Sequence, residues 1–445
     1  MPTKEEWLAK ALQPAEESRR LHRQYRGKIQ TFPKCPIRGL DDFALWYTPG
    51  VAAPCWDIQQ APALVYDFTN KANSIAVVSD GTRVLGLGDI GPEAGLPVME
   101  GKALLFKYLG GVDAVPICLG TKDPEEIVRT VKLLEPSFGG INLEDIAMPK
   151  CFRVLSEARR VCAIPVWHDD QQGTGTVLLA ALLNALKVVG KKIGQVRIAM
   201  IGMGAANTPT YRYLKASGAD AGNIVGCDLG GILGPHRHDY EANPDYREQW
   251  TVCVESNREQ RRGGIAEALV GADVCVAFSA GGIIQPEWIK TMAKEAIVFA
   301  CANPIPEIWP WEAKEAGARI VATGRSDFSN QVNNSLVFPG IFRGALDVRA
   351  HTISDEMALA AALELAACAE ERGIHEDNII PTMDEWQVVP RIAAATALAA
   401  QRQGLAQLCL TREELIQEAT SRIQIVRQGV RLFMKEGCIP PVALT

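Results

Sequence analysis

The feature that most constrains the fold is an alternation of short apolar runs with helical segments along most of the chain. Such alternation is typical of parallel βαβ units. Strands are predicted at Ser74–Val78, Ala114–Ile117, Val196–Ile201, Asn223–Cys227, Val274–Ala277, Ile297–Ala300 and Ile320–Ala322. Helices are predicted at Gly101–Tyr108, Pro124–Leu134, Gly173–Val189 and Asn207–Ala216. We therefore expect a protein of the α/β class.

A length of 445 residues is more than one core usually supports, so we expect two domains and a helical appendage. The first is expected to be an α/β domain over residues 1–160. The second is expected to be a doubly wound, mostly parallel α/β domain over residues 161–385. Residues 386–445 should form C-terminal helices that pack on the core. Thr411 and Glu414 have the spacing of a capping box at the start of one of these helices.

Composition restricts the partners of this chain. It has 46 basic and 52 acidic residues, well mixed, which argues against a surface for nucleic acid. The richest apolar stretch, Val177–Val189, is interrupted by Asn184 and Lys187 and is too short to cross a bilayer. The N-terminus lacks the apolar core of a signal peptide, and the 12 cysteines form no CxxC pair. We expect a cytoplasmic protein with reduced thiols and with no membrane or nucleic-acid partner.

Two pairs of adjacent carboxylates follow apolar runs that have the character of buried strands. Glu144 and Asp145 come after a run that ends at Ile141, and Asp169 and Asp170 follow a run that ends at Trp167. Carboxylates at strand ends converge where a sheet presents its ligand sites. Four ionised acids close together repel one another unless a cation lies among them. The pattern therefore predicts an oxygen-rich site for Mg²⁺ or Mn²⁺.

Two glycine-rich loops follow apolar strands, and they compete as the site of a dinucleotide. The loop Gly86–Gly91 matches G-x-G-x-x-G letter for letter, whereas Gly202–Asn207 has asparagine at the third glycine position. A dinucleotide loop must lead straight into a helix, whose N-terminus binds the pyrophosphate. Pro92 and Pro97 are expected to delay any helix after the first loop. We therefore predict that the second loop binds the cofactor.

The strand after the second loop supplies a further signal for a dinucleotide. It ends at Asp228, 26 residues after Gly202, where an acid can bind the ribose hydroxyls. An ionised carboxylate at that place repels a 2′-phosphate, and no lysine or arginine follows until Arg237. The pattern favours NAD over NADP, with Arg237 as the residue through which NADP remains possible.

Longer motifs in a fixed order, from about residue 40 to residue 390, resemble those of the malic enzymes in their short prokaryotic form. Together with the two acid pairs, these motifs are Tyr47–Val51, Ser79–Asp89, Met99–Ala103, Ala322–Asp327, Gln331–Asn334 and Phe338–Gly340. Two positions depart from the family pattern, namely Gln172 in place of a frequent histidine and Gly175 in place of alanine. The resemblance implies an N-terminal α/β substrate domain, a Rossmann-like NAD-binding domain and a helical C-terminal tail.

The resemblance also implies a reaction, which is the oxidative decarboxylation of L-malate to pyruvate and CO₂ with reduction of NAD, dependent on Mg²⁺ or Mn²⁺. It implies a homodimer. Two alternatives use the same residues: an NADP-preferring malic enzyme, and a lyase of the malolactic type that retains NAD and converts malate to lactate and CO₂. A nucleotide-sensing protein without catalysis is a third alternative. It predicts the loss of acid, base or metal positions, and all of these are present.

Residue roles are carried over from the family motifs. Lys102 is implied to be the general base and Tyr47 the general acid. The implied metal ligands are Glu144, Asp145 and Asp170, with Asp169 in a supporting role. The implied substrate contacts are Arg83, Asn303 and Asn334. The implied cofactor contacts are Thr174, Gly202, Gly204, Asn207, Asp228, Ser279 and Asn303.

The chemistry explains why these residue types are needed. A lysine acts as a base only when its amine is neutral, so the pKa of Lys102 is expected to be lowered by burial or by positive neighbours. A tyrosine with a lowered pKa suits the protonation of the enolate at C3. Tyr47 lies in a segment rich in proline and glycine, and such a segment could reach across to a partner subunit.

Overall fold

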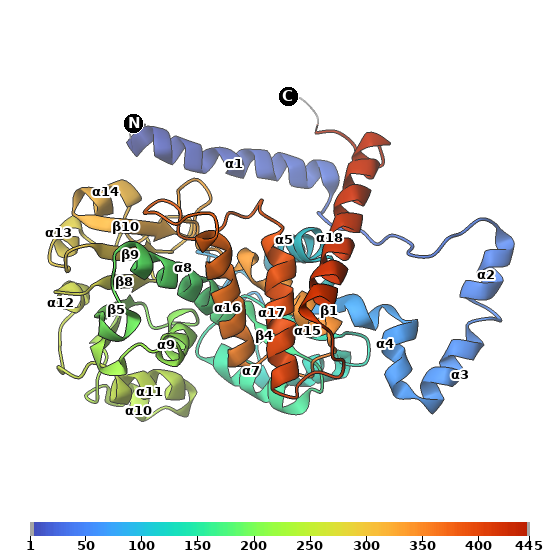
Figure 1. Cartoon of the computed structure of the whole chain (residues 1–445), viewed down its shortest axis with the longest axis horizontal. Coiled ribbons are helices and arrows are strands. Elements are labelled where there is room, and N and C mark those ends of the chain that lie inside the picture. The colour runs from blue at the N-terminus through green and yellow to red at the C-terminus, as the bar shows by residue number, and fades with distance from the viewer. Residues whose placement is uncertain (1–3, 443–445) are drawn as a thin grey trace.

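The computed structural model describes residues 4–442 and shows an α/β fold built on two sheets (Figure 1). The first sheet has four parallel strands in the order β2-β1-β3-β4. Its strands are β1 (Ser74–Ser79), β2 (Asp113–Cys118), β3 (Gly140–Leu143) and β4 (Val166–His168). Every residue of β1, β3 and β4 is buried, as expected for strands covered by helices on both faces.

The second sheet has six strands in the order β10-β9-β8-β5-β6-β7, and only the pairing of β7 with β6 is antiparallel. Its strands are β5 (Ile198–Ile201), β6 (Ile224–Asp228), β7 (Gly231–Ile232), β8 (Val274–Ala277), β9 (Ala296–Ala300) and β10 (Ala318–Thr323). The chain winds outward from β5 in both directions, which creates a switch point between β5 and β8 where such sheets bind ligands. All predicted strands are present, and only the two-residue β7 was not predicted.

Helices cover both sheets, and α2 and α3 lie apart from them. Those of the N-terminal half are α1 (Lys4–Tyr25), α2 (Leu40–Trp46), α3 (Ala52–Gln60), α4 (Val65–Phe68), α5 (Pro92–Gly110), α6 (Pro124–Leu134), α7 (Lys150–Val161) and α8 (Thr174–Val188). Those of the nucleotide-type domain are α9 (Asn207–Ala216), α10 (His238–Glu241), α11 (Arg247–Glu255), α12 (Ile265–Leu269), α13 (Pro286–Ile289) and α14 (Pro310–Glu315). The remaining helices are α15 (Phe338–Asp347), α16 (Asp355–Glu370), α17 (Val388–Arg402) and α18 (Arg412–Lys435), and α18 begins at the predicted capping box.

Two features of the packing bear on the domain limits. Strand β4 pairs with β3, so the first sheet continues to His168, beyond the expected boundary at residue 160. Helices α15, α17 and α18 pack against α5 of the first domain, and α16 packs against α8. The chain therefore returns to the first domain after β10, and α8 lies between the two sheets within the main core.

One prediction about the first glycine loop is wrong. Helix α5 begins at Pro92, directly after Gly91, so the prolines do not delay it. Proline suits the first position of a helix, because its fixed φ is already helical and the first N–H groups have no partner within the helix. Both glycine loops lead directly into a helix, so this criterion does not decide which of the two binds the dinucleotide.

The N-terminal part of the chain that includes α2 and α3, residues 40–60, projects from the body of the molecule. In Figure 1 these two helices project to the right of the sheets and of the C-terminal helices. The side chains of α3 include none that is buried. Among the residues that the structure describes, no helix combines the length and the apolar character that crossing a membrane requires.

Candidate functional site

A large cleft of about 760 Å³ opens between the two domains. The cleft brings together most of the residues predicted for the site. Those that line it are Arg83, Lys102, Glu144, Asp145, Asp170, Thr174, Gly204, Ser279, Asn303 and Asn334. They come from the carboxyl ends of strands in both sheets and from the helices that follow, as expected for an α/β fold.

The three predicted metal ligands form one cluster. Oxygens of Glu144, Asp145 and Asp170 all lie within 4.8 Å of one another. Glu144 and Asp145 follow β3, and Asp170 lies in the single wide turn η3 (Asp169–Gly173) that follows β4. The backbone N–H of Asp145 donates to Asp170 Oδ2 at 2.8 Å, which joins the two strand ends. Parallel pairing of β3 with β4 is thus what places these acids together.

The electrostatics of this cluster suit a cation. Burial raises the pKa of Asp145 to about 8, and the charge of Asp170 adds to the shift. Burial also raises the pKa of Glu144, although Lys102 opposes the shift. Asp145 Oδ2 is buried and has no hydrogen-bond partner among the residues that the structure describes. A buried carboxylate oxygen without a partner is costly, so the donor set fits a hard divalent cation that prefers oxygen ligands.

Lys102 lies beside this cluster on α5. Its Nζ is 2.9 Å from Glu144 Oε1 and 2.6 Å from Asp169 Oδ2, and only 8% of its side chain is exposed. The ammonium also lies over the ring of Phe338, 4.2 Å from the centroid. Sequence reasoning gave Phe338 no role at the site, because nothing in a sequence shows which aromatic ring packs beneath a given lysine.

The pKa of Lys102 differs from the sequence-based expectation. Burial lowers it, but the charges of Asp169, Glu144 and Asp170 outweigh burial, and the net shift is upward. The expectation of a lowered pKa is therefore wrong for the protein groups alone. It considered burial and cations but not the carboxylates that contact the amine.

Asp169 holds Lys102 and does not join the acid cluster. It is fully buried, and its Oδ1 accepts a hydrogen bond of 3.1 Å from Trp167 Nε1. A Cβ on Gly173 would lie 1.9 Å from the same Oδ1, so the turn closes around this carboxylate only with glycine there. Turns of this wide type are frequent at functional sites.

The loop that carries Arg83 is tied to the acid cluster. The backbone N–H of Arg83 donates to Asp145 O at 3.0 Å, and Ala147 N–H donates to Thr82 Oγ1 at 2.9 Å. The Arg83 side chain is exposed and donates only to Leu85 O, so its guanidinium is available at the cleft. Because the two loops share these bonds, a carboxylate bound to Arg83 would lie close to Asp145.

The second glycine loop meets the other side of the cleft. Gly202 has φ +86°, and a Cβ there would lie 2.4 Å from Phe278 O, so both conformation and space require glycine. Gly204 lines the cleft. The side chain of Asn207 does not line it. It is fully buried and donates to the carbonyls of Ile201 and Gly202, so it holds the loop in shape.

Asp228 ends β6 as predicted, but its carboxylate already has partners. Arg237 donates to both of its oxygens, at 2.7 and 3.1 Å, and the Tyr240 hydroxyl donates to Oδ2. Arg237 also pairs with Asp239 at 2.7 Å. The sequence analysis did not predict the contact between Tyr240 and Asp228, because nothing in the sequence links these two positions.

Of the two predicted catalytic residues, Tyr47 is the one that does not line the cleft. It follows α2 in the projecting segment, and 71% of it is exposed. It is absent from the cleft lining in the described part of the chain. A single chain therefore does not bring Tyr47 and Lys102 together.

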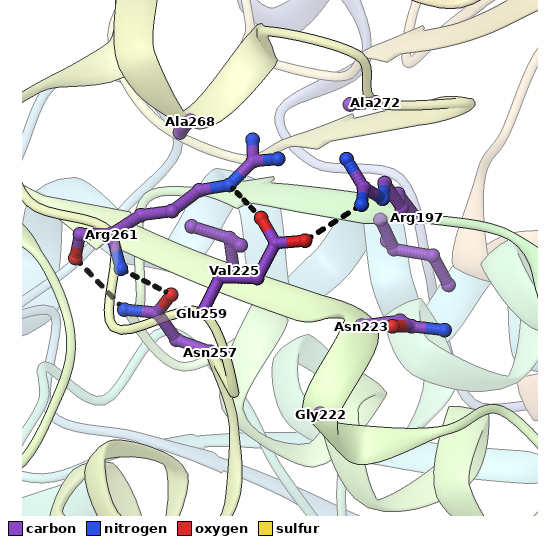
Figure 2. A pocket seen from close by; sticks show the side chains of 10 residues that line it. Arg197, Gly222, Asn223, Val225, Asn257, Glu259, Arg261, Ala268 and Ala272 are labelled. Atoms are coloured by element: carbon purple, nitrogen blue, oxygen red, sulfur yellow. Dashed lines mark hydrogen bonds and ion pairs between the residues drawn. The ribbon is translucent and has the colours of Figure 1, made fainter.

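A second cavity can be set aside. Figure 2 shows Glu259 between Arg197 and Arg261, which it binds at 2.6 and 2.8 Å. This cavity of about 20 Å³ lies beside the residues that enter β5 and β6, at the edge of the sheet opposite the cleft. Its volume is that of about one water molecule.

The fold and the cleft define an α/β protein with a Rossmann-like dinucleotide-binding domain. Family models match "Malic enzyme, N-terminal domain" over residues 26–124 and "Malic enzyme, NAD binding domain" over residues 171–401. The chain belongs to the malic enzyme family, and so to a family of oxidoreductases.

Several relatives are similar over most of the chain. A bifunctional malic/malolactic enzyme of Bacillus subtilis is 46% identical, with 92% of this chain and 98% of the relative aligned. An NAD-dependent malic enzyme of Geobacillus stearothermophilus is 50% identical, over 85% of this chain and 78% of the relative. The crystal structure of an Entamoeba histolytica malic enzyme has a TM-score of 0.97 and 46% identity, over 100% of this chain and 93% of the other. NADP-dependent malic enzymes also occur among the relatives.

Proposed function

We propose that this protein catalyses the oxidative decarboxylation of L-malate to pyruvate and CO₂, with NAD as the hydride acceptor and Mg²⁺ or Mn²⁺ as the required cation. The observation that carries the proposal is the position of Lys102. Its amine contacts Glu144 of the acid cluster, within a cleft that the glycine loop of the dinucleotide domain also lines. Base, cation ligands and nucleotide loop thus surround one volume. The composition and scattered cysteines favour a cytoplasmic location.

Each step assigns a task to a side chain. Arg83 binds a carboxylate of malate. Asn303 and Asn334 bind oxygens of malate from the opposite wall of the cleft. Lys102 takes the proton of the C2 hydroxyl as the C2 hydride leaves for the nicotinamide. The C3–C4 bond then breaks, CO₂ departs, and the electron pair remains in the enolate of pyruvate. Tyr47 delivers the proton to C3. A cation held by the acid cluster supplies Lewis-acid stabilisation of negative charge on oxygen.

The preference for NAD rests on the cluster around Asp228. Two carboxylates, Asp228 and Asp239, share the single guanidinium of Arg237, so the three groups carry a net charge of −1. Only 9% of Arg237 is exposed. An arginine that is buried and already paired on two sides is poorly placed to bind a 2′-phosphate, and the remaining charge repels one.

The proposed assembly is a homodimer in which each projecting segment completes the cleft of the partner subunit. The segment exposes large apolar side chains that a monomer would leave in water, including Leu40 (85%), Trp56 (63%) and Trp46 (51%). Several large apolar side chains exposed on one short segment are typical of a surface that another molecule covers. A second copy is the occupant that also explains why Tyr47 is remote from the cleft of its own chain, and two-fold dimers are the commonest assembly.

A lyase that retains NAD and forms lactate is the second candidate. The Bacillus subtilis relative, named a bifunctional malic/malolactic enzyme, supports keeping it, because it is similar over nearly its whole length. The same base, acid and cation ligands serve both outcomes, which differ in whether the hydride leaves with the cofactor or returns to pyruvate.

One assay separates these candidates. The purified protein is incubated with L-malate and Mn²⁺ and with NAD or NADP in turn, while reduced cofactor, pyruvate and lactate are measured. Pyruvate and NADH in equal amounts are expected, with a higher kcat/KM for NAD. Lactate without reduced cofactor would favour the lyase, and a higher kcat/KM for NADP would reverse the cofactor preference. Removing divalent cations with EDTA should abolish turnover, and added Mn²⁺ should restore it.

A further inference from the structure

We propose that Glu307 is a positioning residue for the dinucleotide, because its buried carboxylate ties together the two loops that follow β8 and β9 at the cofactor side of the cleft. This inference rests on the proposed function in one respect, namely that a nicotinamide dinucleotide occupies the cleft. Glu307 itself does not line the cleft, so it would act only through these loops.

The carboxylate bridges the loops with one oxygen each. Glu307 Oε1 accepts from the N–H of Ser279 at 2.6 Å, and Oε2 accepts from the N–H of Ala302 at 3.0 Å. Ser279 follows β8 and Ala302 follows β9, and both line the cleft together with Asn303. These two hydrogen bonds therefore fix the spacing of the two loops, both of which line the cleft.

Main-chain hydrogen bonds also join the two loops. Gly282 N–H donates to Pro306 O at 2.9 Å, and Ile284 N–H donates to Glu307 O at 3.0 Å. The first of these loops also supports the glycine loop, because Phe278 O occupies the space where a Cβ of Gly202 would lie. A displacement at Glu307 would thus reach the loop that is expected to bind the pyrophosphate.

The charge environment shows that Glu307 is not an ordinary ion-pair residue. The side chain is fully buried. Burial raises its pKa to about 7, and only the backbone N–H groups of Ala302, Ser279 and Glu307 itself oppose the shift. The titratable groups that face it are the thiols of Cys275 and Cys301, whose own pKa values are raised. A carboxyl group buried without a cation is costly, and groups perturbed in this way cluster at functional sites.

The informative substitution is Glu307→Gln. Glutamine keeps the size of the side chain and one acceptor oxygen, but its NH₂ group would face one of the two N–H donors. One loop must then move, and a hydrogen bond to a charged acceptor is lost. We expect binding of the cofactor to weaken about tenfold, the scale of one such bond. The kcat at saturating cofactor and the KM for malate should stay within about twofold.

The experiment measures NAD and NADP binding by titration calorimetry on the full chain, without malate, and then the steady-state constants. The matched control is Glu364→Gln, which alters a mostly buried carboxylate that binds Arg391 and Arg412 on the C-terminal helices. Weaker cofactor binding in Glu307→Gln alone supports the inference. Equal dissociation constants for wild type and Glu307→Gln, or equal changes in both variants, would overturn it. Failure of the wild type to bind either dinucleotide would overturn the proposed function itself.

Discussion

At the scale of single residues, the site combines an amine and four carboxylates, and all of these groups except Asp170 are buried. Lys102 contacts Glu144 and Asp169, and the shared charge of these acids raises the pKa of the amine despite burial. The Lys102 amine in these contacts remains protonated unless the carboxylates bind another cation. The lysine and the cation are therefore linked, because a cation bound to Glu144 and Asp170 offsets the charge that holds the proton on the amine.

The first prediction concerns this amine. Lys102→Ala should lower malate oxidation by about 10²- to 10⁴-fold, the range that a positioned base contributes. Binding of NAD should persist, because the glycine loop and Ser279 are untouched. The control is Lys107→Ala on the same helix, whose amine pairs with Asp113 outside the cleft. Turnover close to wild type in the Lys102 variant would contradict the assignment of the base.

The second prediction concerns pH and Glu307. Its pKa is about 7 in the folded protein against 4.5 for the unperturbed group, so between these values the folded state binds more protons. Its contribution to stability is complete below about pH 4.5 and is lost as the pH rises through about 7. The free energy of unfolding should therefore fall with rising pH more steeply in wild type than in Glu307→Gln, by on the order of 3 kcal/mol in total. Denaturant titrations between about pH 5 and pH 8 measure the two slopes, and parallel slopes would disprove the raised pKa.

At the scale of elements, the parallel strands were predictable and some of their consequences were not. The acid pairs follow buried strands, and pairing of β3 with β4 brings Glu144, Asp145 and Asp170 together as expected, whereas Asp169 contacts Lys102. The prediction for the start of α5 is wrong, because Pro92 begins the helix that it was expected to delay. Local patterns report which strands exist. They do not report the partners that Asp228 or Glu307 finds, which lie on other segments of the chain.

The third prediction tests the wide turn after β4. Gly173→Ala would place a methyl group 1.9 Å from Asp169 Oδ1, so the carboxylate that holds Lys102 must move. We expect a loss of stability of about 1–3 kcal/mol, typical of overpacking, and a fall in kcat larger than the change in cofactor binding. Gly120→Ala is the control, since no atom lies within 4 Å of its added Cβ. Unchanged kcat in a folded Gly173 variant would show that Asp169 does not position the lysine.

At the scale of the whole molecule, the sequence predicts a catalytic role for Tyr47 but gives no sign of the assembly on which the position of this tyrosine would depend. In one chain Tyr47 lies in a segment whose large side chains are mostly exposed. Figure 1 shows α2 and α3 of this segment extended away from the sheets. In the proposed homodimer, apolar side chains such as Trp46 and Trp56 would be covered by the partner subunit, an arrangement that no local sequence pattern encodes.

The last prediction tests this sharing of the site. Tyr47→Phe and Lys102→Ala should each be nearly inactive, and a mixture of the two, unfolded and refolded together, should regain about one quarter of wild-type activity. Random mixing makes about half of the dimers mixed, and in each of these one site pairs an intact Lys102 with an intact Tyr47 from the partner. The control replaces one variant with the double variant, which can form no intact site. If both residues came from the same chain, no mixed dimer would have an intact site and activity would not return. Light scattering on the same samples reports the assembly, and a monomeric wild type would refute the shared site.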